Sequence, residues 1–184
     1  MAGFVHFCQS SDISLSLLLV ADNGAHLKSL LNGFQEVRNQ NENCFKVYSC
    51  ESVSQVLKVL EPPQVDFVAF CVNLKRLNAL TEIEESILRL DRAFLLDRIC
   101  LICDSSQSVG SLMPKIVHLK HKYQLHVLWG NLESKPEEVG NRLSRLASAV
   151  CGITSGFPII THRSWHERLR QQDDFSSIPS DITF

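Results

Sequence analysis

The chain alternates between short apolar runs and amphipathic segments, and this alternation constrains its fold more than any other feature. Five apolar runs are predicted to be buried strands, at residues 15–20, 44–50, 65–72, 99–103 and 125–129. Each is followed by apolar residues spaced at i, i+3 and i+4, which is the pattern of an amphipathic helix. Continuous apolar runs are typical of parallel sheets with both faces covered. The sequence therefore predicts a three-layer α/β fold, with a parallel-rich, five- to six-stranded sheet and helices on both faces, joined by right-handed crossovers.

Two helices have boundaries that can be predicted from their residues. Thr81 and Glu84 have the spacing of a capping box, which predicts a helix that begins at Thr81 and continues to about Phe94. The last core helix is expected from about Pro136 to Cys151, because a proline and two glutamates occupy its first turn and a glycine follows it. We expect one α/β domain over residues 1–152 and a C-terminal extension over residues 153–184, with a short helix and a frayed tail.

The charge and the cysteines of the chain exclude several classes of protein. The 184 residues contain 18 basic and 20 acidic side chains that are well mixed, so no basic field points to nucleic acid or to a membrane surface. No apolar run approaches the ~18 residues of a membrane-spanning helix, and the first residues lack the pattern of a signal peptide. The seven cysteines are odd in number and mostly lie in apolar runs, which is typical of a protein from a reducing compartment.

A C-x-x-C pair and several histidines invite a metal or redox interpretation. Cys100 and Cys103 lie inside an apolar run, where the geometry of a strand points residues i and i+3 to opposite faces. Core thiols are therefore favoured over a redox or metal pair, because a redox C-x-x-C normally opens a helix. The histidines at helical spacing have no cysteine or carboxylate pattern beside them and are expected to be solvated: His118, His121, His162 and His166.

The stretch of residues 15–34 is where a nucleotide-binding α/β protein would carry its phosphate loop. That loop needs a glycine, four residues, then Gly-Lys-Ser or Gly-Lys-Thr, because only backbone without a Cβ can wrap the phosphates. Lys28 and Ser29 match the Lys-Ser pair. Leu27 and Asp22 replace the two required glycines, while Gly24 occupies an interior position. The phosphate loop is therefore degenerate.

These replacements disfavour a nucleotide in two ways. Leu27 places a bulky side chain where the motif has glycine, and Asp22 places a carboxylate near the triphosphate. One such like-charge contact at ~5 Å costs on the order of 3 kcal/mol at an effective dielectric constant near 20, which is about a hundredfold in affinity. Lys28 and Ser29 are more simply interpreted as solvated side chains on the first turn of a helix.

Other elements of a nucleotide enzyme are missing as well. A GTPase needs Asp-x-x-Gly after the second retained strand, Asn-Lys-x-Asp after the fourth and Ser-Ala-Lys after the fifth, whereas residues 51–54, 103–106 and 130–133 match none of them. A phospho-receiver domain is an alternative, since Asp22 and Asp104 lie at predicted strand ends. Its constellation is incomplete too, because the second strand ends in Cys50-Glu51 and the fifth in Trp129-Gly130. We expect no catalytic residues, no cofactor and no metal.

Several stretches resemble the centromere protein M family. They are residues 17–20, 65–74, 81–87, 91–96 and 118–124. Their order and extent carry the resemblance, which covers nearly the whole chain and is weakest beyond Gly152. The resemblance implies a small-GTPase-like fold that lacks one strand and the switch region and binds no nucleotide. It also implies a structural subunit of the inner kinetochore in the nucleus, in contact with centromere protein I and assembled with centromere proteins H and K. A divergent GTPase that acts as a switch remains the alternative.

Two apolar pairs are candidates for the surface that binds a partner. Phe94, Leu95 and Leu96 are consecutive and span about 200° of a helix surface, so they cannot all face the sheet. Leu95 and Leu96 therefore form one candidate patch. Trp165 and Leu169 form another, because they are the only large apolar residues of a mostly polar segment. An equally simple interpretation is that Trp165 and Leu169 cap the core of the domain itself.

Overall fold

Six strands form one sheet in the computed structural model, which describes residues 3–7, 15–38, 45–58, 63–90, 97–107 and 110–151. The strands are β1 (Gly3–Phe7), β2 (Leu15–Ala21), β3 (Phe45–Cys50), β4 (Phe67–Val72), β5 (Ile99–Asp104) and β6 (His126–Gly130). Their order across the sheet is β1-β3-β2-β4-β5-β6. The neighbouring strands β3, β2, β4, β5 and β6 are all parallel, and β1 runs antiparallel to β3 at the edge of the sheet. The five predicted parallel strands are confirmed.

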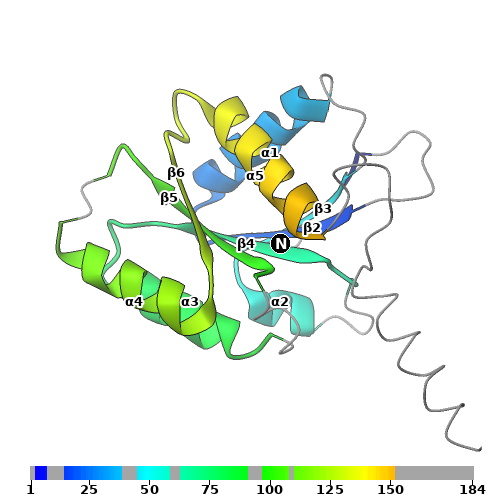
Figure 1. Ribbon diagram of the computed structural model, residues 1–184. Helices are drawn as coiled ribbons and strands as arrows, with labels where there is room; N and C mark the ends of the chain where they lie inside the picture. The colour runs from blue at the N-terminus through cyan, green and yellow to red at the C-terminus, as the bar shows by residue number, and fades with distance from the viewer. Residues whose placement is uncertain are drawn as a thin grey trace, which may run out of the picture.

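The sheet has helices on both faces, so the molecule has three layers (Figure 1). The helices are α1 (Gly24–Arg38), α2 (Val53–Leu57), α3 (Ala79–Ile87), α4 (Met113–Tyr123) and α5 (Pro136–Cys151), with a short 3₁₀ turn, η2 (Gly110–Leu112), before α4. Figure 1 shows α1 and α5 above the sheet and α2, α3 and α4 below it. The predicted three-layer α/β fold is thereby confirmed.

Strand β2 shows why continuous apolar runs indicate this architecture. Its backbone pairs in parallel with β3 on one side and β4 on the other, so that Leu17 lies between Val47 and Phe67. Leu17 and Leu19 belong to the core cluster under α1 and α5, whereas Leu18 packs in the cluster under α2, α3 and α4. Both faces of the strand are buried, and every residue of β4 and β5 is buried as well.

The cysteine pair in β5 confirms the prediction from strand geometry. Cys100 lies in the cluster under α1 and α5, and Cys103 lies in the cluster on the opposite face. Burial raises the pKa of Cys103 to about 12 and raises the pKa of Cys100 further. Both thiols are therefore protonated core residues, because the thiolate is the reactive form of cysteine.

Three predictions of element position were incomplete or wrong. Strand β1 was not predicted, and it precedes the strand that was expected to be first. The predicted capping box is also wrong. Helix α3 begins at Ala79, so Thr81 lies inside its first turn and not at the N-cap. The Thr81 hydroxyl instead accepts a hydrogen bond from Lys115 Nζ at 2.6 Å. Helix α3 ends at Ile87, earlier than expected, although Leu90 in the following turn still packs against the core. Helix α5, from Pro136 to Cys151, has the predicted bounds.

Helices α1 and α5 touch through their backbones. A Cβ atom built on Gly33 would lie 2.3 Å from the carbonyl oxygen of Pro136, and one built on Gly140 would lie 2.9 Å from the carbonyl carbon of Gly33. Real side chains do not tolerate such contacts with backbone, so both positions require glycine. The two glycines therefore allow the backbones of α1 and α5 to lie in contact on one face of the sheet.

We predict that Gly33→Ala lowers the free energy of unfolding by about 1–3 kcal/mol, because the added methyl group forces α1 away from α5. Alanine has the higher helix propensity by ~1 kcal/mol, so propensity cannot cause a loss and the measured loss understates the cost of packing. Gly24→Ala on the same helix is the matched control, since its Cβ would meet no atom within 4 Å. Urea denaturation measures both variants. A Gly33→Ala protein as stable as the Gly24→Ala protein would contradict this packing.

Candidate functional site at the carboxyl edge of the sheet

The five parallel strands end at one edge of the sheet, which is where ligands bind in open α/β folds. The chain passes from β2 to its neighbour β3 on one side and then crosses to β4 on the other side. The connections therefore diverge between the ends of β2 and β4. This point, together with the end of β5, is where a nucleotide or phosphoryl site would be built.

The connection from β2 to α1 is too short to form a phosphate loop. The strand ends at Ala21 and the helix begins at Gly24, so only Asp22 and Asn23 lie between them. Asn23 closes this turn itself, since its Oδ1 accepts a hydrogen bond from the backbone N–H of Ala25 at 3.0 Å. A phosphate loop needs several successive backbone N–H groups outside a helix.

The motif residues predicted from the sequence therefore lie in a helix and not in a loop. Leu27 is already in the first turns of α1, where it packs against the core cluster under α1 and α5. Lys28 is exposed to solvent, and Ser29 is partly exposed beside it. The structure thus places Lys28 and Ser29 on the side of α1, as expected for solvated residues, while Gly24 opens the helix.

Asp22 is engaged by a side chain that is distant in sequence. Arg76, in the connection between β4 and α3, forms an ion pair with Asp22 Oδ2 and a second one with Glu82 Oε1 at 2.6 Å. The hydrogen bond that Arg76 donates to Asp22, followed by the charge of Glu82, raises the pKa of Arg76 above its usual value. The guanidinium thus bridges the point where the connections of β2 and β4 diverge.

A hollow lies beneath this bridge, between the ends of β2, β3 and β4 and the first turns of α3. Its lining is apolar at the sheet, where Val20 and Phe70 are buried, and apolar on α3, where Ile83 is partly buried. Its other lining residues include three carboxylates, Asp22, Glu51 and Glu82. Asp22 was the one carboxylate of the three that the sequence had indicated.

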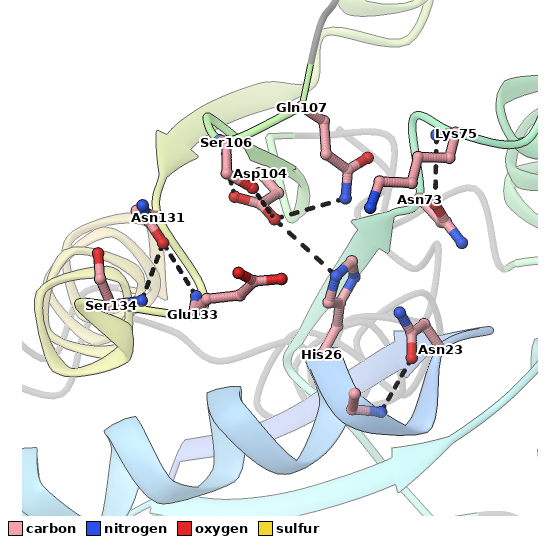
Figure 2. A network of polar contacts seen from close by, with 11 residues as sticks. Asn23, His26, Asn73, Lys75, Asp104, Ser106, Gln107, Asn131, Glu133 and Ser134 are labelled. Carbon is pink, nitrogen blue, oxygen red and sulfur yellow. Dashed lines mark hydrogen bonds and ion pairs between the residues drawn. The ribbon is translucent and has the colours of Figure 1, made fainter.

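A second polar cluster surrounds Asp104 at the end of β5 (Figure 2). The Asp104 side chain is fully buried and accepts hydrogen bonds from the backbone N–H of Ser106 at 3.0 Å, from the Ser106 hydroxyl at 2.8 Å and from Gln107 Nε2 at 3.4 Å. His26 of α1 points toward it, with Nε2 3.9 Å from Asp104 Oδ2. Asp104 thereby stabilises its own turn.

The charge state of Asp104 follows from these contacts. Burial alone would raise the pKa of its carboxyl, but the bonds from Ser106 and from the backbone of Leu132, together with His26, hold the pKa below its usual range. Asp104 is therefore a hydrogen-bonded carboxylate, not a proton donor. His26 Nδ1 and Gln107 Oε1 are buried and have no hydrogen-bond partner among the described residues.

Among the described residues no group of three or more histidines, cysteines, aspartates or glutamates could hold a metal ion. Cys71, which lines the hollow, is protonated, because burial and then the charges of Asp22 and Asp104 raise its pKa. No helix in the described part of the chain is long and apolar enough to cross a membrane.

The predicted partner-binding residues, Leu95, Leu96, Trp165 and Leu169, lie outside the described residues, as does the whole extension of residues 153–184. The described residues contain other large apolar side chains that are exposed: Leu57, Leu77, Leu88, Met113 and Val117. Sequence reasoning missed these. The signal for Leu88 was present, because it falls beside Ile87 and outside the apolar stripe of α3.

Comparison with known proteins gives the family of the chain. The model of the family described as Centromere protein M (CENP-M) matches residues 13–166. Centromere protein M of Bos taurus is 28% identical over 148 residues, and that of Homo sapiens is 27% identical over 146 residues. Each alignment covers 77% of this chain and 79% of the relative.

Comparison with solved structures supports the α/β fold and gives no information on function. The signal receiver domain of an HD domain-containing protein from Pseudomonas fluorescens Pf-5 superposes with a TM-score of 0.50 and 12% identity. The match covers 79% of this chain and 95% of that domain. The family match extends over most of the described residues, and on this ground the chain belongs to the centromere protein M family.

Proposed function

We propose that this centromere protein is a non-catalytic structural subunit of the inner kinetochore, a pseudo-GTPase that binds no nucleotide. Membership of the centromere protein M family places it at the centromere, in the nucleus. The observation that carries the proposal is the connection between β2 and α1, in which two residues stand where a phosphate loop would be. Function in this subunit then belongs to its outer surface.

Electrostatics at the carboxyl edge supports the same proposal. Three carboxylates line the hollow, and a fourth, Asp104, is buried at the end of β5. Arg76, a cation that could have faced a phosphate, is paired with Asp22 and Glu82. A triphosphate would have to compete for this guanidinium, and each like-charge contact left at ~5 Å costs on the order of 3 kcal/mol at an effective dielectric constant near 20.

The partner in this proposal is centromere protein I, bound directly, within an assembly that also contains centromere proteins H and K. Binding through Leu95, Leu96, Trp165 and Leu169 remains a prediction from the sequence. The exposed leucines of the described part add support for a protein-binding surface, because Leu88 and Leu57 are 67% and 51% exposed at the ends of α3 and α2.

We predict that GTP with Mg²⁺ leaves the melting temperature of the purified chain unchanged. A ligand at a hundred times its Kd would add ~2.7 kcal/mol of stability, which corresponds to a rise of roughly 5–10 °C for a protein of this size. Differential scanning calorimetry measures the shift, with Lys28→Ala as the control, because loss of this exposed lysine should not alter the result. A clear rise with GTP that Lys28→Ala abolishes would show a working, divergent GTPase.

We also predict that Leu96→Glu or Leu169→Glu leaves the chain folded but abolishes co-elution with centromere protein I in size-exclusion chromatography. A carboxylate forced into an apolar contact loses its hydration without gaining a partner. Ala25→Glu is the matched control, since it adds the same charge at an exposed residue of α1 that is not one of these leucines. Unchanged co-elution of both test variants would discard the assigned patch.

A further inference from the structure

We propose that the free edge of β6 binds an extended segment of a partner protein, which adds a strand to the sheet and carries apolar and acidic residues in alternation. This inference rests on the proposed function, because it describes the segment that a partner would present. Strand β6 is the last in the sheet, and among the described residues no further strand pairs with it. An unpaired strand edge is a template for the backbone of another chain.

The backbone of β6 presents hydrogen-bonding groups on its free side. The carbonyl oxygen of Gly130 faces β5, where it accepts a hydrogen bond from the N–H of Ser105 at 3.0 Å. The carbonyl oxygen of Trp129 faces away from β5 and accepts one from Arg142 Nη1 at 2.7 Å. Because successive residues of a strand bond to opposite sides, the N–H groups of Val127 and Trp129 and the carbonyl of Val127 face the free side as well. These are the groups that an added strand would bond.

The sequence of β6 does not protect this edge. Natural edge strands carry charged residues, prolines or bulges that prevent pairing with another chain. Strand β6 reads His-Val-Leu-Trp-Gly, without a lysine, an arginine, a carboxylate or a proline. All five residues are partly exposed, whereas those of its neighbour β5 are all buried. Arg142, itself exposed, covers one carbonyl of the edge, and an incoming backbone N–H would replace it there.

Helix α4 presents an apolar flank beside the free edge. Its Lys115 and Lys122 bond residues of α3, so one flank of α4 faces that helix. Met113 and Val117 lie on the other flank, since each residue advances 100° around a helix and both are two residues from Lys115. They are 43% and 44% exposed. Because α3 packs against β4 while α4 leads into the outermost strand, this flank lies on the side of the free edge.

One face of the added strand would therefore meet apolar side chains. Val127 and Trp129 point to the face of the sheet that α4 covers, where they are partly buried. A strand paired with β6 places every second side chain on this same face. Those side chains would lie beside Met113 and Val117, so burial favours apolar residues at these positions.

The other face of the added strand would meet arginines of α5, the helix on the opposite side of the sheet (Figure 1). Arg142 and Arg145 are exposed and have no carboxylate partner among the described residues. Glu138, one turn before Arg142, pairs instead with Lys135 at 2.7 Å. Acidic residues at the alternate positions of the strand would complement these arginines. A second copy of this chain is disfavoured, because it would bring the same arginines together.

The test uses a peptide of this pattern and the full chain. Acetyl-Thr-Val-Glu-Val-Glu-Val-Thr-amide is titrated into ¹⁵N-labelled protein, and hydrogen exchange of single amides is followed by two-dimensional NMR. We expect the peptide to slow exchange at Val127 and Trp129 in a saturable manner, by about tenfold or more, because a bond to the peptide protects their N–H groups. Leu128 is the internal control, since its N–H already faces β5.

Two matched peptides separate backbone pairing from charge. N-methyl groups on the three central amides remove the N–H donors and block pairing, while the side chains are unchanged. Lysine in place of both glutamates keeps the backbone and reverses the charge. We expect neither peptide to slow exchange at Val127 or Trp129.

A variant of the chain then assigns the contact to the backbone of β6. Val127→Pro removes an N–H that faces the free side and leaves the bonds between β6 and β5 in place, so the chain should still fold. Val127→Ala is the matched control, because it also removes the valine side chain but keeps the N–H. We expect the proline variant to lose binding of the acidic peptide, measured by chemical shifts at Trp129 and Val117, and the alanine variant to retain it. The amide spectrum of each variant reports whether it is folded.

Three results would overturn the proposal. The first is unchanged exchange at Val127 and Trp129 with the acidic peptide, and the second is equal protection by the N-methylated or the lysine peptide. The third is a dimer of the chain, seen by sedimentation equilibrium and abolished by Val127→Pro, which would assign the edge to a second copy. Failure here is distinguishable from failure of the proposed function. Co-elution with centromere protein I and the lack of stabilisation by GTP would both persist if only the strand site were wrong.

Discussion

The burial of β2 on both faces is the constraint on which the rest of the structure depends. The strand pairs with β3 and β4 and separates the two core clusters, so nearly all of its side chains are buried and apolar. Helix α1 follows after the two-residue turn of Asp22 and Asn23 and meets α5 backbone to backbone at Gly33. This short connection leaves no room for a phosphate-binding loop of several residues.

The carboxyl edge of the sheet has kept the position of a ligand site but not its chemistry. In place of a loop of backbone N–H groups, the edge has an ion-pair bridge from Arg76 to Asp22 and Glu82, and a turn held by Asp104. These groups stabilise one another.

The sequence predicted the five parallel strands, the two-faced core and the bounds of α5, because each has a local signal in apolar spacing or in capping residues. It could not predict β1, since an antiparallel edge strand without a crossover helix depends on distant pairing with β3. The start of α3 at Ala79 was missed for a similar reason, because the hydroxyl of Thr81 binds Lys115 of α4 instead of capping the helix. At the site, the sequence identified the degenerate residues Asp22 and Leu27. The ion pair between Asp22 and Arg76 could not be predicted, because the two residues are distant in sequence and only the tertiary fold brings them together.

Whether the carboxyl edge holds a nucleotide is tested most directly by the nucleotide content of the protein as it is purified. The full chain, alone and in complex with centromere protein I, is denatured, and the released nucleotides are separated by anion-exchange chromatography. The structure predicts that neither GDP nor GTP is released, because the turn at Asp22 and Asn23 offers no cradle for phosphates. Release of guanine nucleotide in an amount close to one per chain would contradict this conclusion.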